Sequence, residues 1–167
     1  MSVLVNSIGT SASASASSEY GIFFNATNEK GFPTDAIFKT DIIPEVMFKD
    51  VEYNNKLFLH IEKLEVIANK IETQAFNNFF KSVNANSKFK IKSKSIASEA
   101  FAGISSTSLN PTKVWISKDC VTMGYRAFYN VVGDIYCEAT TAPTGWDSQW
   151  TSKTVTYGIS EAQFDAL

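Results

Sequence analysis

The sequence predicts an α+β fold: a mostly antiparallel β body with one long amphipathic helix over about 56–83 and an extended N-terminal arm. Three observations lead to this prediction. Apolar residues recur at spacings of three and four within 56–83. Residues 88–96, and much of the chain after Lys113, show the alternation and β-branched content of strands. Residues 7–18 are almost all small and carry no charge.

The first 18 residues are expected to form an arm, and residues 19–167 a single α+β domain. A length of 167 residues suits one domain with its own core. The arm has too little apolar area to offset the entropy of ordering, so we expect it to be disordered until a neighbouring subunit holds it. Its candidate assembly residues alternate Ser with Ala: Ser11, Ala12, Ser13, Ala14, Ser15, Ala16 and Ser17.

Two short strands are expected at 36–38 and 42–43, and Pro44 prevents the second from continuing as a central strand. The long helix follows. Its predicted apolar stripe is Leu57, Ile61, Leu64, Ala68, Ile71, Ala75 and Phe79. Residues 57–61 also fit strand alternation, so the first turn of this helix is open to both interpretations.

The remaining chain is interpreted as β. Residues 88–96 predict a strand with a fully cationic face, and 114–116 a second strand. Residues 125–132 and 135–140 predict an antiparallel hairpin across the Gly133-Asp134 dipeptide. A last strand is expected at 153–159, and Ser160 with Gln163 predicts a capping box and a final helical turn. We identify no internal repeat and no long linker.

Composition bounds the function. Charged residues make up 19% of the chain and aromatic residues 13%, which suits a surface partly covered by partners. A net charge of −2 gives no overall basic footprint for nucleic acid. No apolar run is long enough to span a membrane, and the N-terminus lacks the features of a secretory signal. We expect synthesis in the cytoplasm with reduced thiols.

Residue types suited to catalysis are scarce. His60 is the single histidine, which removes the usual triads and two-histidine metal sites, and we interpret it as an ordinary helix residue. Cys120 and Cys137 are too far apart in sequence for a zinc motif, and we expect them to pack in the core. No spacing of Asp and Glu residues in the sequence indicates hydrolysis by a pair of carboxylates. We therefore expect no enzyme, no cofactor and no metal.

Two constellations are candidates for binding. The cationic strand offers an electrostatic contact through Lys88, Lys90, Lys92 and Lys94. Protection of a sheet edge or contact with an acidic neighbour is favoured there over nucleic acid. The loop 141–152 offers a partner or glycan contact through Trp146, Asp147, Gln149 and Trp150. Interface anchoring and packing in the core are the other interpretations of these tryptophans.

The sequence thus predicts a non-enzymatic structural subunit of a large assembly, by general character a bacteriophage virion protein of the head, neck or tail. Its partners would be copies of itself and other structural subunits, joined through strand addition by the arm. It would reside in the virion after synthesis in the host cytoplasm. The alternative is a carbohydrate- or receptor-binding module that uses the loop tryptophans.

Overall fold

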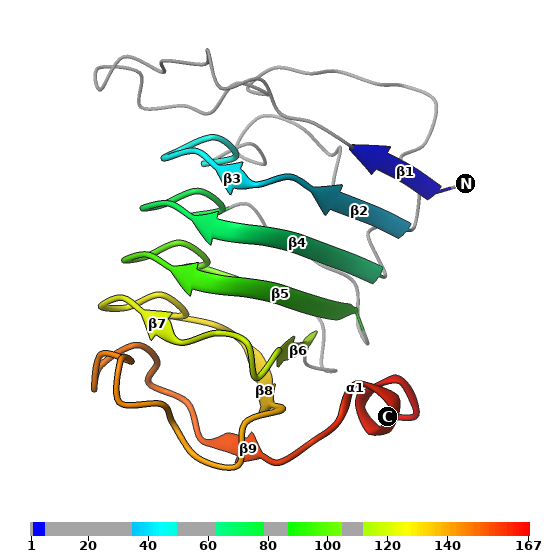
Figure 1. Ribbon diagram of the computed structural model, residues 1–167, viewed down its shortest axis with the longest axis vertical. Helices are drawn as coiled ribbons and strands as arrows, with labels where there is room; N and C mark the ends of the chain where they lie inside the picture. Colours follow the sequence, from blue (N-terminus) through cyan, green and yellow to red (C-terminus); the bar gives the residue numbers. More distant parts are fainter. Residues whose placement is uncertain (1, 6–34, 50–62, 79–86, 105–111) are drawn as a thin grey trace.

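The computed structural model describes residues 2–5, 35–49, 63–78, 87–104 and 112–167, and its dominant feature is a single parallel β-sheet (Figure 1). The sheet order is β1-β2-β4-β5-β6-β8-β9, with the short strands β3 and β7 paired to β4 and β5. Within these ranges the elements are β1 (Ser2–Val5), β2 (Asp35–Lys39), β3 (Ile42–Ile43), β4 (Lys63–Ile71), β5 (Lys88–Ile96), β6 (Thr112–Ile116), β7 (Thr122–Met123), β8 (Gly133–Cys137), β9 (Val155–Tyr157) and the helix α1 (Glu161–Asp165).

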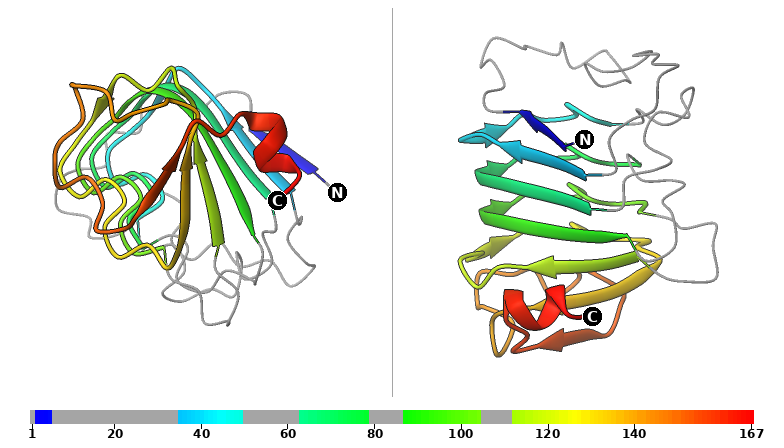
Figure 2. Two further views of the ribbon diagram at one scale, coloured as in Figure 1. Left: turned by 90° about the horizontal axis from the view of Figure 1, so that it is seen from below. Right: turned by 90° about the vertical axis from the view of Figure 1, so that its right-hand side faces the viewer.

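Successive strands are neighbours and parallel, so the chain winds as a solenoid in which each turn, or rung, stacks on the one before (Figure 2). The parallel register places equivalent residues in columns that run across the sheet. Leu64, Phe89, Val114 and Ile135 form one such column. All four are at most 1% exposed, so this column is part of the continuous core between the sheet and the turns that follow it.

A second column is aromatic and runs through the turns. Phe48, Phe76, Phe101 and Phe128 stack with ring centroids 4.9, 4.9 and 5.0 Å apart. Trp150 continues the column, edge-on to Phe128 at 5.8 Å. Each phenylalanine closes a six-residue segment that begins with Ile or Met, and these segments recur at intervals of roughly 25 residues, a period typical of solenoids: 43–48, 71–76, 96–101 and 123–128. The expectation of no internal repeat is therefore wrong.

The repeated segments share one backbone corner. Val46, Gln74, Glu99 and Arg126 all have φ between 51° and 56°, in the left-handed region. The amide of Gln74 donates to Ser98 O at 3.1 Å, and that of Glu99 to Tyr125 O at 3.0 Å, so each corner is hydrogen-bonded to the next rung. These bonds offset the cost of the unusual backbone conformation and fix where the corner side chains project.

The predicted antiparallel body with a long helix is wrong. Residues 63–71 of the expected helix form β4, and the turns 72–78 follow; residues 50–62 and 79–86 lie outside the described residues. Leu64, Val66 and Ala68 are buried at every second position, as in a strand. The helical spacing arose because Ile71, Ala75 and Phe76 also turn inward at the corner that follows.

The predicted hairpin across Gly133-Asp134 is also wrong. Residues 125–130 form turns, and Gly133 and Asp134 begin β8, which pairs in parallel with β6 rather than with 125–132. A Cβ atom on Gly133 would lie 2.0 Å from the backbone oxygen of Thr112. The glycine therefore permits a close approach between two rungs, which is a common role of a glycine within a strand.

Other local predictions are confirmed. Short strands occur at β2 and β3, β5 spans Lys88–Ile96, and the last strand β9 falls within the expected 153–159. Ser160 caps α1: its side chain accepts from the Gln163 amide, and the Gln163 side chain accepts from the Ser160 amide, which completes the capping box. The alternation within these strands and the capping box were thus interpreted correctly.

Candidate interaction surface

The side of the sheet opposite the core, here called the outer face, displays the alternate residues of each strand. In β5, Phe89 and Ile91 point into the core at 1% exposure, while the lysines between them point outward. The register aligns Glu65, Lys90, Trp115 and Tyr136 in one column of this face. The outer face therefore carries charged side chains of both signs over β4 and β5, and aromatic side chains over β6 and β8.

The C-terminal segment docks on the aromatic part of the outer face. Phe164 of α1 is fully buried, with its ring 6.4 Å from that of Trp115 and 5.7 Å from that of Tyr136. The indole Nε1 of Trp115 donates to the Ile159 carbonyl at 2.8 Å. This contact fixes the chain just before the capping box, so α1 lies against the sheet (Figure 2).

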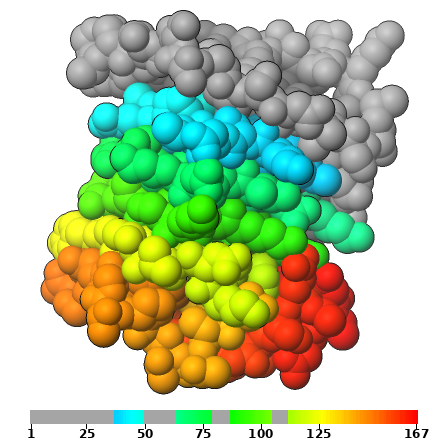
Figure 3. Space-filling view, in the orientation of Figure 1, coloured from blue at the N-terminus to red at the C-terminus, as the bar shows by residue number. Residues whose placement is uncertain are grey.

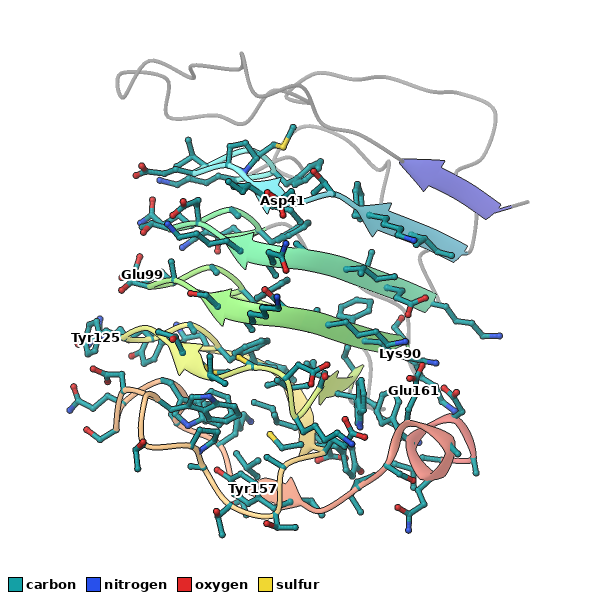
Figure 4. All side chains as sticks on the ribbon, in the orientation of Figure 1. Asp41, Lys90, Glu99, Tyr125, Tyr157 and Glu161 are labelled. Atoms are coloured by element: carbon teal, nitrogen blue, oxygen red, sulfur yellow. The ribbon has the colours of Figure 1, made fainter. Side chains whose placement is uncertain are left out.

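The carboxylates of α1 pair with lysines of β5. Lys90 Nζ lies 3.0 Å from Glu161 Oε1 and 2.8 Å from Asp165 Oδ1. Lys92 Nζ lies 2.7 Å from Glu65 Oε1 and 2.9 Å from Glu161 Oε1. Figure 4 shows Lys90 and Glu161 facing each other between sheet and helix. The lysine row and the acidic helix thus form one ionic network.

This network shifts the pKa of its members. Burial opposes the charge of Lys90 and Lys92, but hydrogen bonds to the carboxylates outweigh it, and both pKa values lie above the ordinary 10.5. The hydrogen bond from Lys92, with a further one from Lys90, outweighs burial and lowers the pKa of Glu161 below 4.5. Each ion favours the charged form of its partner, so α1 is held electrostatically near neutral pH.

The last carbonyls of the chain accept from two more lysines. Lys88 Nζ donates to Asp165 O at 2.7 Å, and Lys113 Nζ to Leu167 O at 2.7 Å. Cations at the C-terminal end of a helix satisfy carbonyls that have no partner within it. Acidic side chains of the same chain thus face the cationic strand, and its contact with an acidic neighbouring molecule stays a prediction. The edge interpretation is wrong, because β5 is paired on both sides.

An open groove adjoins the docked helix on the same face. It encloses about 670 Å³ over β2, β4 and β5, and its charged lining residues are Lys39, Asp41, Lys92, Lys94 and Asp119. Lys39 and Lys94 are exposed and make no ion pair with any described residue. Asp41 accepts a hydrogen bond from Asn69. The surface shown in Figure 3 places the C-terminal segment against the lower rungs, while the segments of β2 and β4 lie above it.

The tryptophans of the 141–152 loop lie in the core. Trp146 and Trp150 are 8% and 6% exposed, and their rings meet edge-on at 4.9 Å. Trp146 Nε1 donates to the Cys120 carbonyl at 3.0 Å. Of the three interpretations of these residues, packing in the core is therefore what the structure shows. Asp147 and Gln149 remain exposed, and the backbone amide of Gln149 donates to Asp147 Oδ1 at 2.8 Å.

The two cysteines are buried, as expected. Cys120 and Cys137 are both free thiols with no exposed surface. Burial raises the pKa of each to about 12, so neither forms a thiolate at neutral pH. His60 and the arm residues 11–17 lie outside the described residues, although residues 2–5 of the predicted arm pair with β2 of the same chain.

The sequence interpretation missed the partners of the lysine row, Glu161 and Asp165, because more than 60 residues separate them from β5. It also missed the corner residues such as Arg126. The signal that would have found the corner residues is the recurring segment that ends in Ala-Phe at 75–76, 100–101 and 127–128. Aligning the chain on these segments places the equivalent corners and strands of successive rungs side by side.

Comparisons with known proteins give no relative from which a function could be taken. No family model, no curated protein and no solved structure matches the chain. Across the described ranges, no group of three His, Cys, Asp or Glu residues is placed to hold a metal ion. No helix in those ranges is long and apolar enough to cross a membrane.

Proposed function

We propose that this chain is a non-enzymatic structural subunit that binds protein partners, including copies of itself, through the outer face of its sheet. The observation that supports the proposal is the open groove beside a segment that is already docked. The chain's own C-terminus shows how this face receives a peptide: an aromatic residue seats on Trp115 and Tyr136 while carboxylates pair with Lys90 and Lys92.

The architecture suits such a role. A solenoid spreads side chains over an extended, rigid surface, because each rung repeats the same strand direction. In the groove the strands β2 and β5 supply the exposed Lys39 and Lys94, and the turn after β6 supplies the exposed Asp119. Charges held on strands bind with less loss of side-chain and backbone freedom than charges on loops.

The charge of the groove favours a protein over a nucleic acid. Basic and acidic side chains both line it, and Lys92 is already neutralised by Glu65 and Glu161. A polyanion needs a largely uniform positive surface, whereas protein interfaces commonly match both signs. We therefore assign the groove to a protein segment of mixed charge.

The test is self-association measured by light scattering over a range of concentrations. The Lys39→Glu/Lys94→Glu double variant reverses the charge of the groove, and Lys153→Glu is the matched control at an exposed position outside it. We expect the double variant to weaken association at least tenfold and the control to leave it unchanged. A wild-type chain that stays monomeric, or a double variant that associates normally, contradicts the proposal.

The arm gives a second test of the same proposal. β1 pairs with β2 on one edge, and within the described residues no strand pairs with its other edge. An open strand edge is suited to strand addition by another chain. We expect deletion of residues 2–18 to abolish the multimer and to leave a folded body, since the core of buried side chains lies in the later rungs. A truncated chain that assembles normally contradicts this role of the arm.

The setting of the assembly, a bacteriophage virion, remains a prediction from the general character of the sequence. Its test is mass spectrometry of purified particles from a culture that expresses the chain. Recovery of the chain in stoichiometric amount in intact particles supports the virion location, and its absence from them contradicts it.

A further inference from the structure

A separate feature lies at the corner of the rung that contains 123–128, away from the outer face. Arg126 is the only arginine in the sequence; the other basic residues are lysines. Its guanidinium carbon lies 4.8 Å from the centre of the Tyr125 ring and 4.6 Å from that of the Tyr129 ring. Two aromatic rings thus hold the guanidinium in place, an arrangement that favours the planar, delocalised cation of arginine over lysine.

The cation of Arg126 is not neutralised by the part of the chain that the structure describes. No carboxylate there lies within ion-pair distance of it. Two carboxylates of the adjacent rungs are engaged elsewhere: Glu99 Oε2 accepts from Gln74 Nε2 at 2.7 Å, and Asp147 Oδ1 accepts from the backbone amide of Gln149. The rings restrict the guanidinium, and no side-chain acceptor among the described residues takes up its N–H donors.

A pocket of about 270 Å³ opens beside this cation. Besides Tyr125, Arg126 and Tyr129, it is lined by hydroxyl and amide side chains: Ser148, Gln149, Thr151 and Ser152. Tyr125, labelled in Figure 4, lies at the outer edge of the rung, and the residue is 39% exposed. The pocket therefore combines one oriented cation, aromatic surface and several neutral hydrogen-bonding groups.

We propose that this pocket binds a carboxylated monosaccharide unit, such as a uronic acid residue of a glycan. The fork of an arginine pairs with a carboxylate through two parallel hydrogen bonds. Ser148, Gln149 and Ser152 supply donors and acceptors for sugar hydroxyls, and the volume suits one sugar ring. A single cation without further basic residues in the lining matches one negative charge, rather than the doubly charged phosphate group.

The proposed pocket uses other residues than the tryptophan-based glycan contact that the sequence offered as an alternative. Trp146 and Trp150 are in the core, and only Gln149 of the four predicted contacts lines this pocket. The pocket shares no residue with the groove of the outer face. Its test is therefore independent of the proposed protein-binding function.

The experiment uses the uniqueness of Arg126. The full-length chain labelled with ¹⁵N has a single arginine Nε–Hε signal, which is followed by NMR at slightly acidic pH during titration with sodium glucuronate. Glucose, sodium acetate and inorganic phosphate are titrated separately. We expect the signal to shift with glucuronate with a dissociation constant on the order of 1 mM, the value typical of a ligand of this size. Glucose and acetate should bind at least about tenfold more weakly.

Variants separate the arginine fork from simple charge. Saturation-transfer NMR on the ligand gives the affinity of each variant, and thermal unfolding checks that it is folded. Arg126→Lys retains the charge but loses the fork, and we expect at least about tenfold weaker binding of glucuronate. Lys153→Ala removes a nearby cation that does not line the pocket and should change nothing.

Four results overturn the proposal. They are an arginine signal that does not move with glucuronate, equal binding of glucose, stronger binding of phosphate than of glucuronate, and unchanged affinity in Arg126→Lys. The first three are obtained on the wild-type chain, so they hold whether or not the variant folds.

Discussion

Replacement of Phe101 by alanine tests whether the aromatic column holds the rungs together. Phe101 has no exposed surface, and its ring stacks on Phe76 at 4.9 Å and on Phe128 at 5.0 Å. Truncating a buried phenylalanine to alanine costs about 3–5 kcal/mol, because apolar contact is lost and a cavity remains. Two stacked neighbours place this site in the upper half of that range, at about 4–5 kcal/mol.

Urea unfolding of the full chain measures this loss. With a slope of about 2 kcal/mol per molar urea, Phe101→Ala is expected to lower the midpoint by about 2 M. Trp115, Trp146 and Trp150 report on the rungs from β6 onward by fluorescence, while circular dichroism reports on the whole sheet. In a solenoid, each rung is stabilised by its neighbours. We therefore expect that in the variant the unfolding transition followed by fluorescence and the one followed by circular dichroism no longer coincide.

Phe101→Leu is the matched control. It retains most of the apolar volume and loses only the ring stacking, so we expect a cost of about 1–1.5 kcal/mol. A Phe101→Ala variant that loses less than about 1 kcal/mol, or one that behaves like Phe101→Leu, would refute the reasoning, because neither result allows the stacked column to be a main source of cohesion between rungs.

Three further predictions follow from particular contacts. The folded-state pKa of Glu161 is below its ordinary 4.5, so the attachment of α1 is present above that pH and is lost as the pH falls through the lowered value; faster amide exchange in 161–167 at low pH checks this, and unchanged exchange contradicts it. Cys120 and Cys137, each with a pKa of about 12, should resist iodoacetamide at pH 8 in the folded chain and react once it is unfolded, as read by mass spectrometry; rapid labelling of either in the native state contradicts their burial. Gly133→Ala should cost about 1–3 kcal/mol in urea unfolding, because its Cβ would lie 2.0 Å from a backbone oxygen, while Val132→Ala at a 42% exposed position should change stability by less than about 0.5 kcal/mol.

The candidate sites were only partly predictable. Lys88, Lys90 and Lys92 were identified as a cationic face because alternation within one strand is a local pattern. Their partner helix was not, because the pairing of Lys90 with Glu161 spans the whole second half of the chain. The pocket at Arg126 was missed for the same reason: its lining comes from two successive rungs, and only their stacking brings 125–129 beside 148–152.

By itself the sequence determined the local features. Strand alternation located β5, and the Ser160 and Gln163 pair fixed the start of α1. These features depend on neighbours within a few residues, where backbone geometry and capping act directly.

Only the tertiary structure decided the direction in which the strands pair and which segments meet. The spacing of Leu64, Ala68 and Ile71 fits a helix in isolation, and Gly133-Asp134 fits a hairpin turn. Stacking of rungs overrides both, because the in-register columns and the phenylalanine column bury apolar side chains of every rung against the next. That gain comes from contacts between residues roughly 25 apart, which no short window of sequence reports.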